Sequence, residues 1–248
     1  MSHFQPDAWL AEILGRPVFR LTSAVSTMED GALADEMASL ARRADAFFYA
    51  KLPTSDVPEC IALVKAGFAV VETGITLSWG GDERSVAKGI SAGIARQDQL
   101  EAIPKIAEVC FRWSRFHLDP QIPRNLANLI KRRWIENCVK GKRGSALYAA
   151  EIDGTVAGFL AVIESTVLNR PVAIIDLMGV APGHQGHGVG TALVHSFVSD
   201  WKGRASELRV GTQAANIQSL SFYERNGFRI VDSNYALHAH YRNGEIRR

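Results

Sequence analysis

The amino-acid sequence predicts an α/β fold of the α+β kind, because strand and helix patterns alternate along the chain. Residues 172–203 give the first observation: an apolar run, a glycine-rich turn and a helical pattern follow one another. The second is a repeat, since 48–78 and 208–238 share the order strand, polar turn, helix, Gly-Phe, strand. The third is Asp153-Gly154 between two apolar runs, which is typical of an antiparallel hairpin.

Composition narrows the possible classes of protein. The 248 residues are 47% hydrophobic, enough for one large or two small domains, and a net charge of +2 does not indicate a nucleic-acid partner. The three cysteines are far apart in the sequence, which favours reduced thiols over disulfides or a zinc site. The first residues lack the pattern of a signal peptide, and no apolar run reaches membrane-spanning length. We therefore expect a cytoplasmic protein that binds no metal, nucleic acid or membrane.

Residues 1–85 read as alternating short elements. Leu33, Met37 and Leu40 share one face of an amphipathic helix, and glycines follow two other helical patterns. The expected helices are 7–14, 29–44 and 59–66, and the expected strands are 18–21, 47–52, 68–71 and 75–79.

Residues 86–248 continue the alternation. Asp98 and Glu101 have the spacing of a capping box before a helix, and Asn216 is placed to cap another helix that Gly227 would end. The expected helices are 98–111, 126–138, 189–203 and 216–226, and the expected strands are 93–96, 147–152, 156–163, 172–180 and 207–212.

The repeat suggests two halves built on related plans. Superposing Gly67-Phe68 on Gly227-Phe228 brings Ile75 onto Tyr235. The first half has no counterpart of the glycine-rich turn. If the halves are related, the first is non-catalytic, extends the sheet and shapes the pocket of the second.

The glycine-rich turn at 185–191 predicts an anion site. Small residues let consecutive backbone N–H groups face a ligand, and the dipole of the following helix adds partial positive charge. The spacing matches neither a dinucleotide fingerprint nor a Walker loop, and the alternative is an ordinary turn between strand and helix. Gly179, inside the preceding strand, predicts a bulge or a ligand close to the backbone.

These pieces carry a resemblance to a known superfamily. Gln185-x-x-Gly188-x-Gly190, the strand at 207–212 and the segment from Asn216 to Tyr223-Glu224 and Gly227-Phe228 resemble the GNAT N-acetyltransferases over about residues 93–240. The resemblance implies the GNAT fold, a mixed central sheet flanked by helices. It implies a catalytic acetyltransferase domain at 86–248 and a degenerate GNAT-like half at 1–85. It also implies an N-acetyltransferase with acetyl-CoA as cosubstrate and no metal.

A narrower resemblance concerns the acceptor. Ser114-Arg115-Phe116, Arg133–Val139 and Leu208–Gln213 are similar to the bacterial dTDP-fucosamine acetyltransferases, which acetylate dTDP-4-amino-4,6-dideoxygalactose. This implies a small-molecule amine as partner, namely the 4-amino group of a nucleotide-linked amino sugar. Another small amine, such as an amino acid or polyamine, and a non-catalytic acyl-CoA-binding module stay open as alternatives, as does a homodimer.

The superfamily resemblance also implies residue roles on the cofactor side. The turn would hold the pyrophosphate through backbone amides, and the strand edge would pair with the pantetheine arm and polarise the thioester carbonyl. Asn216 would contact the cofactor, cap a helix, or do both. The expected cofactor-binding residues are Met178, Gly179, Val180, Gln185, Gly186, His187, Gly188, Val189, Gly190, Thr191 and Asn216.

Tyr223 is the expected general acid, because a phenol can protonate the departing thiolate; the alternative is a core aromatic. Leu63 occupies the matching position of the first half. No general base is evident: Asp176, Glu164 or a water relay are equally open.

The acceptor side is expected to use three residues that could also be ordinary surface-loop residues. Arginine suits a diphosphate and tryptophan suits the face of a sugar or base. The candidates are Trp113, Arg115 and His117.

Overall fold

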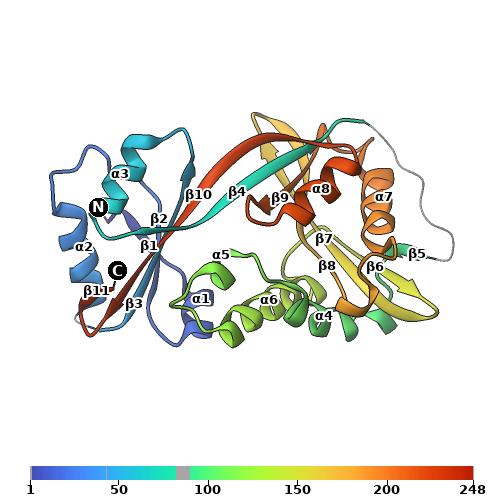
Figure 1. Ribbon diagram of the computed structural model, residues 1–248, viewed down its shortest axis with the longest axis horizontal. Coiled ribbons are helices and arrows are strands. Elements are labelled where there is room, and N and C mark those ends of the chain that lie inside the picture. Colours follow the sequence, from blue (N-terminus) through green and yellow to red (C-terminus); the bar gives the residue numbers. More distant parts are fainter. Residues whose placement is uncertain (1, 43, 82–89, 248) are drawn as a thin grey trace.

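The computed structural model describes residues 2–42, 44–81 and 90–247, which form one mixed sheet of eleven strands flanked by helices (Figure 1). The strand order is β1-β2-β3-β10-β4-β9-β8-β7-β6-β5, with β11 on β10. The strands are β1 Phe4–Pro6, β2 Val18–Leu21, β3 Ala46–Pro53, β4 Ala69–Trp79, β5 Ser91–Ile94, β6 Ala146–Ile152, β7 Thr155–Val167, β8 Arg170–Val180, β9 Glu207–Gln213, β10 Phe228–Arg242 and β11 Glu245–Arg247. The expected sheet class is confirmed.

The helices overlap the ranges expected from the sequence, except for the short helix Arg115–Leu118, which the sequence did not predict. They are α1 Ala8–Leu14, α2 Ala32–Ala41, α3 Val57–Lys65, α4 Ala102–Cys110, α5 Arg115–Leu118, α6 Arg124–Val139, α7 Val189–Trp201 and α8 Ile217–Arg225, with 3₁₀ turns at Gln97–Gln99 and Pro182–His184. Within the described residues, no helix has the length and apolar character that crossing a membrane requires.

The two faces of the sheet are covered by different helices. On β6, Tyr148 and Ala150 belong to the core under α7, whereas Ala149 between them belongs to the core shared with α4 and α6. Successive strand residues point to opposite faces, so α7 lies on one face and α4 and α6 lie on the other.

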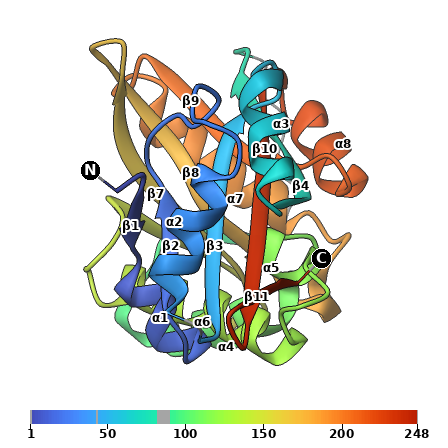
Figure 2. The same ribbon diagram turned by 90° about the vertical axis from the view of Figure 1, so that its left-hand side faces the viewer.

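The sheet joins the two halves of the chain. β4 and β10 are long, pair antiparallel and run side by side across the middle of the molecule (Figure 1). β10 lies between β3 and β4, and β4 lies between β10 and β9. Figure 2 shows β10 running beside β3 and meeting β11 at its end, close to the C-terminus. The domain boundary expected at residue 85 lies outside the described residues and stays a prediction.

The strand register reproduces the sequence repeat. Under the superposition of Gly67 on Gly227, Gly74 matches Asn234, and these two residues pair directly in β4 and β10. The register also shifts at two matching places, between Val70 and Glu72 and between Ile230 and Asp232. Swapping the two strands therefore gives the same pairing, so a local two-fold axis passes through the Gly74–Asn234 pair.

The outer neighbours of these strands obey the same symmetry. β3 pairs with β10 through Leu52 and Tyr235, and β9 pairs with β4 through the matching residues Thr212 and Ile75. The helix caps match too: the side chains of Asp56 and Asn216 accept from backbone N–H groups at the starts of α3 and α8.

Two local expectations are wrong. The 68–71 and 75–79 pieces form one strand, β4, because its pairing with β10 runs through the whole stretch. Asp98 and Glu101 form no capping box. The Asp98 carboxylate instead accepts from the Arg96 guanidinium, and the Gln99 side chain accepts from the Arg96 backbone N–H at 2.8 Å.

Candidate active site

A cleft of about 910 Å³ opens where two parallel strands separate. β8 and β9 pair from Val172 with Glu207 to Ile175 with Val210, and beyond this point residues 176–180 and 211–213 line the cleft. On its other side β8 remains paired with β7 as far as Val180. The end of β8 therefore presents a backbone edge to the cleft that β9 does not cover.

The glycine-rich turn closes one end of this cleft. Gly186 and Gly188 have φ of 82° and 88°, in the left-handed region that favours glycine, and α7 begins immediately after Gly188. A Cβ at Gly190 would lie 3.1 Å from Phe222 and Met178 side-chain atoms, so this residue permits close packing of α7 on β8 and α8. Of the turn residues named from sequence, all except the exposed His187 line the cleft.

Gly179 is required by packing and is not the site of a bulge. A Cβ there would lie 2.5 Å from the sulfur of Cys110 and 2.8 Å from the ring of Phe159. The irregularity in the β7–β8 ladder falls between Ile175 and Leu177, so Asp176 is the bulged residue. Of the two alternatives expected at Gly179, the bulge is therefore wrong by three residues, and a ligand close to the backbone stays a prediction.

Tyr223 approaches the cleft from α8. Its side chain is buried, with 7% exposure for the residue, and its hydroxyl donates to the sulfur of Met178 at 3.7 Å. Burial raises the pKa of Tyr223, so the phenol keeps its proton at neutral pH. The ring packs edge-on against Phe222 and Phe228. Tyr223 is thus both a core aromatic and a protonated hydroxyl at the cleft.

Asn216 also lines the cleft and caps α8, because its side-chain oxygen accepts from the backbone N–H of Ser219 at 3.2 Å. The expected capping role is confirmed, and the position leaves the residue in contact with the cleft.

The far end of the cleft is lined by residues 110–114, Lys131 and Asp176. Trp113 is among them and is 41% exposed. Arg115 and His117 lie outside this lining. Arg115 stacks on Tyr49 and Phe116, and His117 bridges Ser114 and Asn128. Of the three acceptor-side candidates, the structure brings only Trp113 to the cleft.

The two carboxylates considered as bases are placed differently. Asp176 accepts from Trp134 Nε1 at 2.9 Å and pairs with the Arg143 guanidinium at 2.7 Å. Glu164 is exposed and does not line the cleft. The Asp176 carboxylate is therefore held by two donors, and Glu164 is remote.

Lys131 is the cleft residue that sequence reasoning missed. It is 9% exposed, and its ammonium lies 4.9 Å and 5.0 Å from the ring centres of Phe111 and Trp134. Burial lowers the pKa of Lys131 to about 8. The available signal was a lysine on the apolar face of a helix, four residues after Ala127 and four before Ile135, both fully buried.

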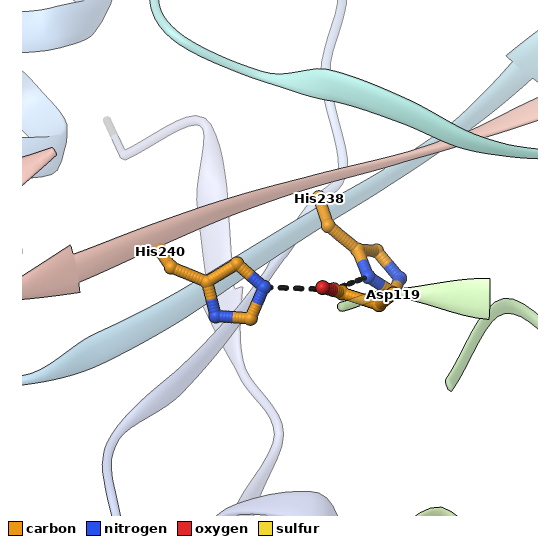
Figure 3. Close-up of side chains that lie close together, drawn as sticks. All are labelled: Asp119, His238 and His240. Atoms are coloured by element: carbon orange, nitrogen blue, oxygen red, sulfur yellow. Dashed lines mark hydrogen bonds and ion pairs between the residues drawn. The ribbon is translucent and has the colours of Figure 1, made fainter. Parts of the chain in front are cut away.

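A buried cluster lies outside the cleft, where Asp119 meets two histidines of β10 (Figure 3). One Asp119 oxygen accepts from His238 Nδ1 at 2.6 Å and from His240 Nε2 at 2.7 Å. Burial alone would raise the pKa of the Asp119 carboxyl, but these hydrogen bonds outweigh it and hold the pKa well below its usual range. Burial lowers the pKa of His238 to about 4.

The ring nitrogens of His238 and His240 that point away from Asp119 indicate whether the cluster is hydrogen-bonded or could hold a metal ion. Arg115 lies 3.3 Å from His238 Nε2 and Arg16 lies 3.0 Å from His240 Nδ1. A guanidinium can only donate, so these nitrogens accept and the protons of the two rings point at Asp119. A metal ion would need the lone pairs of those inner nitrogens, leaving N–H groups facing two arginines. This donor arrangement favours a hydrogen-bond relay over a metal site.

Comparison with known proteins places the cleft in a family context. The model of the Acetyltransferase (GNAT) family matches residues 101–228. The spore coat polysaccharide biosynthesis protein SpsD of Bacillus subtilis (strain 168) is 31% identical over 139 residues, which cover 56% of this chain and 46% of that protein. The uncharacterized N-acetyltransferase MJ1207 of Methanocaldococcus jannaschii is 31% identical over 102 residues, covering 39% and 44%. The matches thus span about half the length of either relative.

The fold has counterparts among solved structures. A tandem GNAT protein from the clavulanic acid biosynthesis pathway, solved without AcCoA, superposes with a TM-score of 0.60 at 16% identity and covers 91% of this chain and 76% of that one. At this identity the likeness concerns the fold alone.

Proposed function

We propose that this chain, which belongs to the acetyltransferase (GNAT) family and is an N-acetyltransferase, transfers acetyl from acetyl-CoA to the 4-amino group of a nucleotide-linked amino sugar. The observation that carries the proposal is the cleft between β8 and β9, with a glycine turn at one end and a buried phenol at its side. The similarity to a protein named for polysaccharide biosynthesis supports an amino-sugar acceptor.

The donor side of the cleft suits acetyl-CoA. The left-handed Gly186 and Gly188 leave no side chain between the backbone amides and a pyrophosphate, and the N-terminus of the thirteen-residue α7 adds partial positive charge. The edge of β8 at Met178–Val180 would pair with the pantetheine amides. A backbone N–H there would polarise the thioester carbonyl.

Tyr223 would supply a proton to the departing thiolate. Its phenol is protonated at neutral pH, and its partner in the structure is the weakly accepting sulfur of Met178. Such an interaction costs little to give up, so the hydroxyl can turn to a sulfur that develops negative charge.

The experiment is a release assay for free CoA with acetyl-CoA and a panel of acceptors: dTDP-linked 4-amino sugars, amino acids and polyamines. We expect kcat/KM to be highest for a dTDP-linked 4-amino sugar. Release with amino acids or polyamines alone would overturn the sugar acceptor. Tight acetyl-CoA binding with no release on any amine would identify a non-catalytic binding module and overturn the transfer activity.

A further inference from the structure

Lys131 and Tyr223 approach the end of β8 from opposite faces of the sheet. The sulfur of Met178, which contacts Tyr223, belongs to the side chains packed with α7 and α8. The next residue, Gly179, faces Cys110 and Phe159 in the core shared with α4 and α6. Lys131 lies on this second side with its ammonium over the ring of Phe111.

We propose that Lys131 is the group that takes the proton from the ammonium of the acceptor; this inference rests on the proposed function. The neutral Lys131 amine accepts one proton, leaving R–NH₂ as the nucleophile. The nitrogen of the acceptor amine forms a bond to the thioester carbon, the C–S bond breaks, and the thiolate takes the Tyr223 proton. The acylated nitrogen then gives a second proton to the Tyr223 phenolate, which restores the phenol. Lys131 gives its proton to solvent through the cleft.

The environment of Lys131 favours its neutral form. The ammonium contacts two aromatic rings, and among the described residues no carboxylate lies within ion-pair distance of it. Burial therefore lowers its pKa to about 8, which leaves a fraction of neutral amine at pH 7.5. The titratable and charged groups that face it from β4, β8, α5 and α4 are Glu72, Asp176, Arg115, Cys110 and His117.

Other groups in the cleft are poorer proton acceptors. Asp176 is held by Trp134 and Arg143, and burial raises the pKa of the Cys110 thiol to about 12. His184 lies in the 3₁₀ turn between β8 and the glycine turn, on the donor side. Arg112 carries a guanidinium, which has hydrogen-bond donors and no acceptor. Lys131 is therefore the cleft residue whose position and charge suit the role.

The competing role for a buried lysine at this end is binding a negative charge of the acceptor. Lys131→Arg separates the two, because arginine keeps the charge and the aromatic contacts but does not release its proton. With a dTDP-linked 4-amino sugar, we expect Lys131→Arg to lower kcat by about 10²- to 10⁴-fold. KM should change by less than about threefold. The proposal would be overturned in favour of anion binding by two results together. These are a near-normal kcat in Lys131→Arg and a lowered kcat or raised KM in Lys131→Met.

A pH profile gives a readout that a structural role would not move. The loss of kcat in Lys131→Arg relative to the wild type should become smaller as pH rises, because the acceptor amine then loses its proton to solution. A deficit constant between pH 6.5 and 9.5 would overturn the proposal. The matched control is Lys140→Arg, an exposed lysine after the end of the same helix, which should keep the wild-type profile. Circular dichroism and Tm establish that each variant is folded.

Titration of the lysine itself needs no acceptor. In ¹³Cε-lysine NMR of the intact protein, the signal absent from Lys131→Arg should titrate near pH 8. A midpoint above pH 10 would overturn the base role. Absence of CoA release by the wild type, with the NMR midpoint near 8, would count against the proposed function and not against the state of Lys131.

Discussion

At the scale of single residues, the hydroxyl of Tyr223 separates chemistry from packing. Tyr223→Phe keeps the ring that packs on Phe222 and Phe228 and removes only the proton donor. We predict that kcat falls by about 10²- to 10⁴-fold while acetyl-CoA affinity changes little, because proton donation belongs to the transition state. Steady-state kinetics and calorimetric titration measure the two quantities.

The matched control for Tyr223→Phe is Leu63→Ala, at the corresponding place of the first half. Leu63 is fully buried, so its truncation should cost about 2–5 kcal/mol of stability and leave kcat unchanged in the folded fraction. Unchanged kcat in Tyr223→Phe on the true acceptor would remove the acid role.

His238 should make stability depend on pH. Burial lowers its pKa to about 4, whereas the unfolded chain has a histidine pKa near 6.5. The unfolded state therefore binds the proton first, and this residue's contribution, about 3 kcal/mol, is lost as pH falls from about 6.5 to 4. We predict that His238→Gln flattens this part of the curve of unfolding free energy against pH. The exposed His195→Gln is the control, and an equally steep curve in His238→Gln would contradict the assignment.

At the scale of elements, the turn before α7 is where the cofactor would be held. Gly188→Val places a β-branched side chain at φ of 88° and between the amides and any pyrophosphate. We predict that acetyl-CoA binding is lost while the protein stays folded with a lower Tm. Gly183→Ala is the control, because nothing lies within 4 Å of a Cβ there. Unchanged affinity of Gly188→Val in calorimetry would refute the role of the turn.

The seam between β4 and β10 makes each half depend on the other. β4 pairs with both β9 and β10, so a chain of residues 86–248 alone would lack the strand that covers two of its edges. We predict that this fragment is insoluble or unfolded by itself and becomes soluble when coexpressed with 1–85. The full chain should unfold in a single denaturant transition. A folded, monomeric 86–248 fragment would show that this part of the chain folds independently.

At the scale of the whole molecule, the two-fold relation does not extend to the glycine-rich turn, where we propose that the cofactor binds. The first half repeats the strands around Gly74, and α2 stands between the parallel strands β2 and β3 as α7 stands between β8 and β9. The segment before α2 nevertheless lacks the Gln-x-x-Gly-x-Gly turn. We predict one acetyl-CoA bound per chain, measured by calorimetric stoichiometry. A stoichiometry of two acetyl-CoA molecules per wild-type chain would contradict this prediction and indicate a second site.

The sequence was sufficient for features set by neighbouring residues. Asn216 caps α8 as its side chain predicts, because a cap needs only a backbone N–H two or three residues away. The glycine turn and its helix follow for the same reason. The alignment of Gly67 with Gly227 predicted equivalences that the strand register reproduces.

Other features were decided by the tertiary structure alone, because they depend on which strand edges and helix faces meet. The parting of β8 and β9 opens the cleft, and the packing of α6 under the sheet puts Lys131 in it. Arg115 and His117 were expected on the acceptor side. In the structure Arg115 contacts His238 and the rings of Tyr49 and Phe116, and His117 bridges Ser114 and Asn128. Long-range contacts of this kind leave no periodic signal along the chain. The sequence therefore determined most of the elements and the glycine-rich turn, and the packing of those elements decided which other residues line the cleft.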